Sequence, residues 1–348
     1  MEQIKTARMQ EVATKLGISA STVSRALRDD PRISLATRAK VRETATALGY
    51  QPNPLVSALM ANRKRRAGGG EIDVIALITH YGAKEDWRAK DVCRWEFEGI
   101  RRRAAELGFK VEVFPLEDFE GDPARLRQIL HARGIRGVLL GFSRDSDPAK
   151  FNLATDGFAV AGLSAYFRSA PVDRANFHGF FNVQLALDQI YTHGYRRPAL
   201  VVPEFNNRIS NNLWSGAFLD WQRRLAPADR CEPFLPAEHA GAGEFASWLE
   251  AQSPDALLIY KVPVRAFLAK KPLAARRDLG LAWLYRTSDE MGLGAGIDGN
   301  LSVVGAAALE LVVEKLNANN FAVSPHPKEV LIKGTWHDGD SLPRLTPD

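Results

Sequence analysis

Cysteine is scarce in this chain of 348 residues, which contains only Cys93 and Cys231. Two cysteines so far apart fit neither a zinc-ligand spacing nor a disulfide framework, so we expect two buried thiols in a reducing cytoplasm. The seven histidines show no paired-ligand spacing either, which argues against a catalytic metal. We expect no metal and no cofactor.

Long hydrophobic runs are also missing. No stretch of 18 uncharged apolar residues occurs, so no transmembrane helix is expected. The first residues lack the apolar segment of a signal peptide, so export is not expected and a cytoplasmic location is. At this length, with 45% hydrophobic residues, the chain needs two or three cores.

Acidic residues are sparse in one region. Residues 1–66 contain 13 Lys/Arg and 5 Asp/Glu, a net charge of +8, whereas the remainder has 33 and 36, a net charge of −3. Such an N-terminal excess of positive charge suits a polyanion such as DNA, although a solvated charged surface is the simpler alternative.

Short-range periodicity in this basic region predicts two short helices joined by a turn. Met9, Val12, Ala13 and Leu16 form one apolar face, and Gly17 follows where a left-handed residue ends a helix. Ser19 is then placed to cap a second helix, with Val23 and Leu27 inward and Ala26 beside them. The pattern predicts a helix-turn-helix whose second helix has a small, polar and basic outer face made by Ala20, Ser21, Ser24, Arg25 and Arg28.

The chemistry of that face favours DNA. Small residues let the backbone approach base edges, and an arginine offers a bidentate fork to guanine. Ser34 is expected to cap a third helix that runs to about Leu48, with Leu35, Val41, Ala45 and Leu48 available for a small core. Gly49 ends that helix.

Residues 52–71 predict a hinge. Asn53 can cap and Pro54 can begin a short helix that is too short to be stable alone in water. Leu59 could insert into a minor-groove step, and the basic run 63–66 with Gly68–Gly70 would form a phosphate-contacting tether. An ordinary linker with a hydrophobic anchor is the alternative.

The whole head resembles that of the LacI/GalR repressor family without gaps over about 50 residues, with Pro54 as one departure. The resemblance rests on Met9–Ala13, Gly17–Ser19, Thr22–Arg25, Ser34, Thr37–Arg38, Gly49–Tyr50 and Pro52–Asn53. It implies that Ala20, Ser21 and Arg25 read bases and that Leu59 is the minor-groove lever. The expected DNA contacts are Met9, Gln10, Ser19, Ala20, Ser21, Thr22, Ser24, Arg25, Arg28, Ser34, Thr37, Tyr50, Asn53, Val56 and Leu59.

From residue 72 onward, apolar runs alternate with helical segments over about 250 residues, which predicts parallel sheets covered by helices on both faces. Strands are expected near 72–78, 110–114, 137–140, 158–161, 198–202 and 256–260. Helices are expected near 95–107, 123–133, 183–193, 214–225 and 245–251. This order resembles the family's effector domain, a periplasmic-binding-protein-like fold of two lobes joined by three crossovers. We expect one lobe near 72–175 with 298–320, and the other near 176–297 with 321–340.

Residues that bind neutral sugars in many members of the family are replaced here. Leu213 stands where an arginine is usual, and Ile259–Val262 and Trp283–Asp289 replace runs that usually contain Asn and Asp. The candidate effector residues are aromatic or cationic, and two of them, Lys261 and Arg286, favour an anionic ligand; packing or surface positions are the alternative for all six. They are His80, Tyr81, Trp87, Trp214, Lys261 and Arg286.

Two motifs are rejected. Gly294–Gly299 matches G-x-G-x-x-G but lacks a strand directly before it, so we interpret it as a crossover loop. Gly162–Tyr166 resembles a nucleophile elbow but lacks the final glycine and a sharp strand-to-helix turn. No catalytic constellation is evident, and we expect no enzyme.

The predicted fold is α/β: a helix-turn-helix DNA-binding domain (1–51), a hinge helix and linker (52–71), a two-lobed effector-binding and dimerisation domain (72–340) and a tail (341–348). Because the tail lacks leucine heptads, we expect a homodimer. The predicted function is a transcriptional repressor that binds a pseudo-palindromic operator and responds to a sugar or sugar derivative. Alternatives are a DNA-binding regulator whose effector domain serves dimerisation alone, and a solute-binding protein or enzyme.

Overall fold

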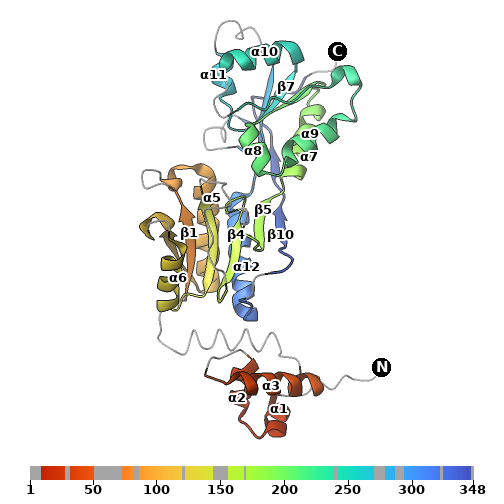
Figure 1. Ribbon diagram of the computed structural model, residues 1–348. Coiled ribbons are helices and arrows are strands. Elements are labelled where there is room, and N and C mark those ends of the chain that lie inside the picture. Colours follow the sequence, from red (N-terminus) through yellow and green to blue (C-terminus); the bar gives the residue numbers. More distant parts are fainter. Residues whose placement is uncertain are drawn as a thin grey trace, which may run out of the picture. The chain divides into compact units, whose positions relative to one another are not determined.

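The structure is a computed structural model that describes residues 9–27, 32–50, 73–81, 86–119, 122–143, 156–167, 170–237, 241–269, 279–286, 294–321 and 324–345. The chain divides into two compact units (Figure 1). One contains the N-terminal head, and the other spans Asp73–Glu314 and Phe321–Asp348. None of the helices in the described ranges is both long and apolar enough to cross a membrane.

The head contains the three predicted helices, α1 (Met9–Leu16), α2 (Ala20–Leu27) and α3 (Leu35–Ala47). Gly17 joins the first two with a left-handed backbone (φ +66°), and the amide of Ile18 donates to the carbonyl of Ala13 at 3.1 Å. Glycine adopts this conformation without steric cost, which explains why α1 ends there.

A small apolar core holds the three helices together. Its buried residues are Val12, Ala13, Val23, Ala26, Val41 and Ala45. One predicted member is wrong: Leu35 is 79% exposed. Leu35 precedes Val41 by six residues, which places the two side chains about 120° apart around the helix, so the first residue of α3 faces solvent.

The second unit contains two lobes, and the first lobe is built on a six-stranded sheet of order β10-β5-β4-β3-β1-β2, paired in parallel throughout. Five consecutive residues of β1, from Ile75 to Thr79, are buried, as expected of a strand covered on both faces. The strands are β1 (Val74–His80), β2 (Lys110–Pro115), β3 (Gly137–Ser143), β4 (Ala159–Leu163), β5 (Arg174–Phe177) and β10 (Glu329–Ile332). The helices are η1 (Trp87–Ala89), α5 (Asp91–Leu107), η2 (Leu116–Phe119), α6 (Pro123–Ala132) and α12 (Leu301–Ala318).

The second lobe is built on a five-stranded sheet of order β11-β9-β8-β7-β6, in which only β11 is antiparallel to its neighbour. Its strands are β6 (Pro198–Val201), β7 (Ala256–Ile259), β8 (Gly280–Trp283), β9 (Ala295–Asp298) and β11 (Thr335–His337). Its helices are α7 (Gly179–Thr192), α8 (Glu204–Ile209), α9 (Leu213–Gln222), η4 (Pro227–Asp229), α10 (Ala242–Gln252) and α11 (Val264–Leu268).

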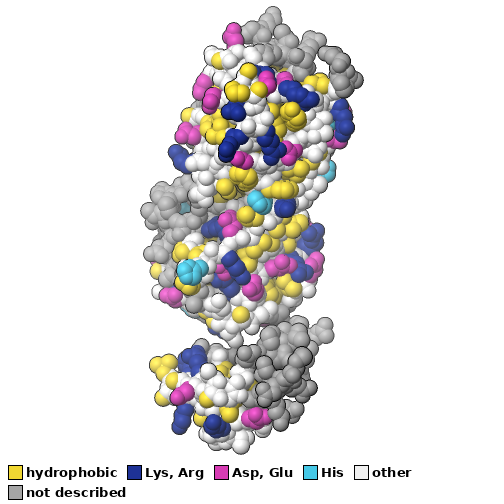
Figure 2. Space-filling model, turned by 90° about the vertical axis from the view of Figure 1, so that its right-hand side faces the viewer, with side chains coloured by type: hydrophobic (Ala, Val, Ile, Leu, Met, Phe, Trp, Pro, Cys, Tyr) yellow, Lys and Arg dark blue, Asp and Glu magenta, His cyan; other side chains and the backbone are white. Residues whose placement is uncertain are grey.

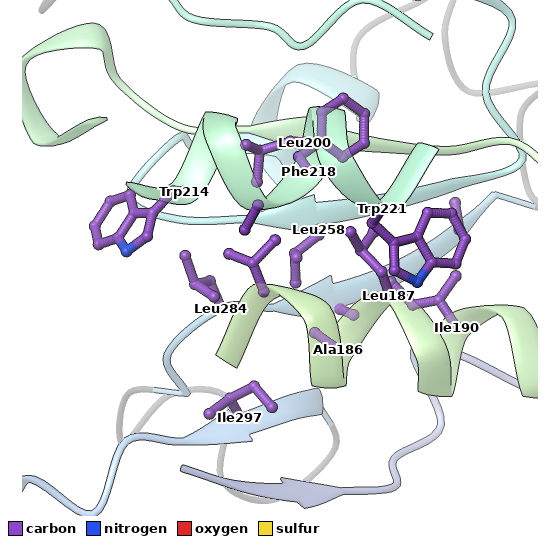
Figure 3. Packing of buried hydrophobic residues seen from close by; sticks show 14 of the residues in the cluster. Ala186, Leu187, Ile190, Leu200, Trp214, Phe218, Trp221, Leu258, Leu284 and Ile297 are labelled. Atoms are coloured by element: carbon purple, nitrogen blue, oxygen red, sulfur yellow. The ribbon is translucent and has the colours of Figure 1, made fainter. Parts of the chain in front are cut away.

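Alternate residues of β6, β7 and β8 are buried in two separate cores, one on each face of the sheet. Leu200 and Leu258 pack against α7 and α9, whereas their neighbours Val201 and Ile259 pack against the side of α10 and α11. Figure 3 shows the first of these cores, with Trp221 of α9 beside Leu187 and Ile190 of α7, Phe218 beside Leu200, and Trp214 at the opposite end of the cluster. A sheet covered on both faces in this way confirms the predicted α/β class.

Three crossovers join the lobes, as the resemblance to the family's effector domain implies. They lie between β5 and α7, between β9 and α12, and between β10 and β11. The predicted assignment of 321–340 to the second lobe is wrong in part, because β10 pairs with β5 of the first sheet and only β11 belongs to the second. The sequence could not reveal this, because a strand of four residues carries no mark of the sheet that it joins.

Several elements differ from the predictions. The sequence did not predict strands β5, β8, β10 and β11 or the short helices α8 and α11. The glycine motif 294–299 is not a loop: Ala295–Asp298 form β9, and α12 follows. The motif therefore forms the strand itself, whereas a dinucleotide fingerprint has its strand before the glycines.

Candidate DNA-binding surface and effector site

The turn before α2 positions the predicted reading helix. Ser19 Oγ accepts a hydrogen bond from the amide of Thr22 at 3.1 Å, and it lies 2.7 Å from Ser21 Oγ. A serine cap satisfies one of the free amides at the start of a helix, so the first turn of α2 is held in place. This confirms the predicted cap, and it occupies the Ser19 hydroxyl within the protein.

The outer face of α2 has two exposed side chains, Ser21 and Arg25. Ala20, Thr22 and Ser24 are half-buried, and Ala20 packs against the head core instead of facing only outward. Arg25 follows Ser21 by one helical turn, and an exposed arginine on a helix can offer a bidentate fork to a base edge. Arg25 is thus the best-placed base reader in α2.

The remaining predicted DNA contacts fall into three groups. Gln10 is exposed at the start of α1, whereas Met9 and Tyr50 are half-buried against the head core. Ser34 caps α3 by accepting from the amide of Thr37 at 3.2 Å, and the two hydroxyls lie 2.8 Å apart. Arg28, Asn53, Val56 and Leu59 lie outside the described residues, as does the whole hinge prediction for 52–71.

Three candidate effector residues lie in the first lobe, at or after the carboxyl end of β1. His80 is half-buried, with Nε2 3.9 Å from Glu117 Oε1. The ring of Tyr81 is buried beneath the ammonium of Lys90, at 4.6 Å. Trp87 is 4% exposed and stacks on Phe142 with ring centroids 4.4 Å apart, so its surroundings match the packing alternative.

A buried polar cluster that the sequence did not predict lies beside Tyr81. Glu96 is fully buried in α5 and accepts a hydrogen bond from the hydroxyl of Ser164, at the end of β4. Burial raises the pKa of Glu96 to about 8, so this carboxyl is mostly protonated at neutral pH. The thiol of Cys93 lies 3.4 Å from the hydroxyl of Tyr166, and burial raises the pKa of both groups.

The surroundings of Ser164 agree with the rejection of a nucleophile elbow at Gly162–Tyr166. Ser164 follows β4 directly and has a left-handed backbone (φ +46°), so a sharp turn is present at Gly162–Tyr166. No helix begins there, and the partner of the hydroxyl is Glu96 and not a histidine. Arg174 Nη1 donates to the carbonyl of Ser164 at 2.7 Å, which fixes the turn.

In the second lobe, Trp214, Tyr260 and Tyr285 form an aromatic cluster with Phe177 of β5. The ring centroids of Trp214 and Tyr260 are 4.9 Å apart, and those of Phe177 and Tyr285 are 4.8 Å apart. Phe177 ends the first lobe's β5, so this cluster joins the two lobes. Of the predicted residues, Trp214 belongs to it, while Lys261 and Arg286 directly follow Tyr260 and Tyr285.

An asparagine ties this cluster to the third crossover. Asn182 is fully buried in α7, its Nδ2 donates to Tyr285 Oη at 3.3 Å, and its Oδ1 accepts from the amide of Gly334 at 2.8 Å. A Cβ at Gly334 would lie 2.5 Å from Ile297 Cγ2, so this position requires glycine. No sequence motif marks either residue, because the contact joins positions 152 residues apart.

Residues 8–53 match the family model described as bacterial regulatory proteins of the lacI family. Curated relatives include the transcriptional regulator AglR of Rhizobium meliloti, 29% identical over 198 residues, which are 56% of this chain and 51% of AglR. The repressor CytR of Escherichia coli is 39% identical over 64 residues, 18% of this chain and 19% of CytR. The chain thus spans about half the length, or less, of these curated relatives.

Solved structures resemble the chain over nearly its whole length. A Lac repressor dimer bound to operator and the anti-inducer ONPF has a TM-score of 0.56 at 17% identity, covering 97% of this chain and 100% of that one. A complex of the transcriptional regulator CelR with cellobiose has a TM-score of 0.54 at 16% identity, covering 96% and 99%. At these identities the similarity establishes the fold: a helical head followed by a two-lobed, periplasmic-binding-like domain.

Proposed function

We propose that this chain, whose residues 8–53 match the lacI family model, is a transcriptional repressor of that family that binds a pseudo-palindromic operator as a homodimer. The observation that carries the proposal is the exposed face of α2, where the capped first turn presents Ser21 and Arg25 on a helix-turn-helix scaffold. The excess of positive charge in residues 1–66 supports binding to a polyanion.

The two-lobed unit supports the second part of the proposal, a small molecule that binds between the lobes and alters operator affinity. Non-glycine residues with left-handed backbone lie where parallel strands end toward the crossovers, and these include Phe142, Ser164 and Lys261. Such strained positions gather at ligand sites. A coupling of about 1–3 kcal/mol between effector and operator is typical of such regulators.

The exposed Arg25 provides the first test. Arg25→Ala should weaken operator binding by about 1–3 kcal/mol and relax the preference for one base pair, because it removes the base-reading fork but no core contact. The measurement is a gel shift with full-length protein against an operator selected from a random DNA pool, followed by a base-preference matrix. Arg101→Ala, an exposed arginine of α5 that pairs with Glu98, is the matched control.

Two outcomes would contradict the proposal. An unchanged base-preference matrix in Arg25→Ala would remove Arg25 from the reading role. If the wild-type protein selects no sequence from the pool, sequence-specific DNA binding itself is wrong. A regulator that uses its two-lobed unit for dimerisation alone would bind the operator and respond to no small molecule.

A further inference from the structure

Lys261 is placed unusually for a surface lysine. It follows β7 at the carboxyl edge of the second sheet, and its backbone is left-handed (φ +53°). The residue is exposed to solvent, yet the surrounding protein strips water from its ammonium, an effect that opposes the charge. The ammonium also lies 5.1 Å from the centroid of the Tyr260 ring, a cation–π contact.

Despite this desolvation, the net effect of the surroundings keeps Lys261 charged. Tyr260 raises the pKa of Lys261 most strongly, so the residue stays protonated at neutral pH. The ring of Tyr260 contacts those of Trp214 and Tyr285, and both of these contact Phe177 of β5, so Lys261 follows a cluster that reaches the first lobe. Across the parts of the chain that the structure describes, no carboxylate lies within ion-pair distance of the Lys261 ammonium.

The facing edge of the first lobe contains polar groups without negative charge. Cys93 and Tyr166 have raised pKa values, so both are neutral at pH 7, and the carboxyl of Glu96 is mostly protonated. These three groups lie together around the hydrogen bond that Ser164 donates to Glu96. An anion that entered between the lobes would meet the Lys261 ammonium on one side and meet no repelling charge from this cluster on the other.

A second donor belongs to the aromatic cluster that includes Tyr260. Trp214 is 2% exposed, and its indole Nε1 has no hydrogen-bond partner. Its ring contacts that of Tyr260, the residue before Lys261. A buried N–H without a partner is costly, about 1–3 kcal/mol, and is a common sign of a missing acceptor.

We propose that the small molecule bound between the lobes is an organic anion, a carboxylate or phosphate derivative of a sugar. Its charged group pairs with the Lys261 ammonium, and another of its oxygens accepts from the indole N–H of Trp214. This inference rests on the proposed role of the two-lobed unit as a ligand sensor. The proposed ligand differs from the cellobiose of the CelR complex because it carries a charge.

The test uses matched ligand pairs with the full-length protein: galacturonate against galactose, gluconate against sorbitol, and glucose 6-phosphate against glucose. Thermal unfolding is followed by tryptophan fluorescence, with sodium chloride at equal ionic strength as the salt control. At least one anion should raise the melting temperature saturably while its neutral partner does not, because an anion that binds the folded state stabilises it.

Variants then assign the effect to the site. Lys261→Gln should weaken binding of the stabilising anion by about tenfold or more, and Lys261→Arg should restore most of it, since a charge-assisted contact is lost and regained. Lys110→Gln, which changes an exposed lysine at the start of β2, should leave binding unchanged. Trp214→Phe should weaken binding less than Lys261→Gln does, because the ion pair remains.

The outcomes separate the two proposals. If a neutral sugar stabilises the protein and Lys261→Gln does not change this stabilisation, the role in ligand sensing is supported and the proposal of an anionic ligand is wrong. If none of the anions stabilises the wild-type protein, the proposal of an anionic ligand is likewise overturned. Operator binding by wild type and Lys261→Gln in the gel shift tests the DNA-binding role independently of either result.

Discussion

The two lobes follow one plan of parallel strands and covering helices, but their helices meet in opposite ways. In the first lobe, α5 and α12 cross almost backbone to backbone: a Cβ at Gly305 would lie 2.0 Å from the carbonyl oxygen of Glu96, and one at Gly99 would lie 1.8 Å from that of Ser302. In the second lobe, α7 and α9 meet through large side chains such as Trp221 and Leu187 (Figure 3). The first contact tolerates no added atom, whereas the second depends on the size and shape of its side chains.

The carboxyl edges of the two sheets also differ, in the polarity and charge of their side chains. The first lobe buries a neutral polar cluster around Glu96, and the second presents aromatic rings followed by the cations Lys261 and Arg286. On the face that Figure 2 shows, acidic, basic and apolar side chains are interspersed over both lobes of this unit. The chemical asymmetry therefore lies where the lobes face each other.

The helix crossing of the first lobe offers the largest expected effect. Gly305→Ala should lower the free energy of unfolding by about 2–4 kcal/mol, because the new methyl group must push α12 away from α5. All seven tryptophans follow residue 86, so tryptophan fluorescence during urea denaturation reports on the two-lobed unit.

Gly216→Ala is the matched control for this prediction. Gly216 lies in the interior of α9, and a Cβ there would meet nothing within 4 Å. The second lobe should gain about 0.5–1 kcal/mol, since alanine favours a helix over glycine. Equal effects of the two substitutions would refute the contrast between the helix crossings.

The buried carboxyl of the first lobe should give a pH dependence that the second lobe lacks. The pKa of Glu96 is about 8 in the folded protein and near 4.5 when unfolded, so the folded state retains its proton over this interval. Stability from this group is therefore fully present below about pH 4.5 and is lost as pH rises through about 8, by on the order of a few kcal/mol. Glu96→Gln keeps a neutral polar group and should abolish that loss.

The measurement is the free energy of unfolding at about pH 5, 7 and 9. Wild type and Glu96→Gln should differ most at the highest pH, with the variant the more stable. Glu98→Gln, an exposed carboxylate two residues along α5, should change stability by less than about 1 kcal/mol at every pH. Parallel curves for wild type and Glu96→Gln would show that Glu96 is ionised in the folded protein.

How much of the structure could be predicted from the sequence depends on how far apart along the chain the contacting residues lie. The head depends on local signals, such as Gly17 after α1 and the Ser19 cap, and these were found. In the two-lobed unit, apolar runs revealed most strands, but the pairing of β10 with β5 and the contact of Asn182 with Gly334 join residues more than 150 positions apart. The sequence does not reveal the burial of Glu96, because a glutamate within an amphipathic helix is expected at the surface unless the elements that pack against the helix are known.

The smallest expected effect comes from two tryptophans on one helix. Trp214 and Trp221 are both 2% exposed in α9, but Trp221 Nε1 donates to Asp188 Oδ1 at 2.7 Å whereas Trp214 Nε1 has no partner. Substitution by phenylalanine leaves a similar gap at each site, so the difference between the variants isolates the hydrogen bond. Trp221→Phe should cost about 1–2 kcal/mol more than Trp214→Phe in urea denaturation without ligand. Equal costs would mean that the Trp214 N–H is already satisfied, which would also remove the acceptor proposed for it between the lobes.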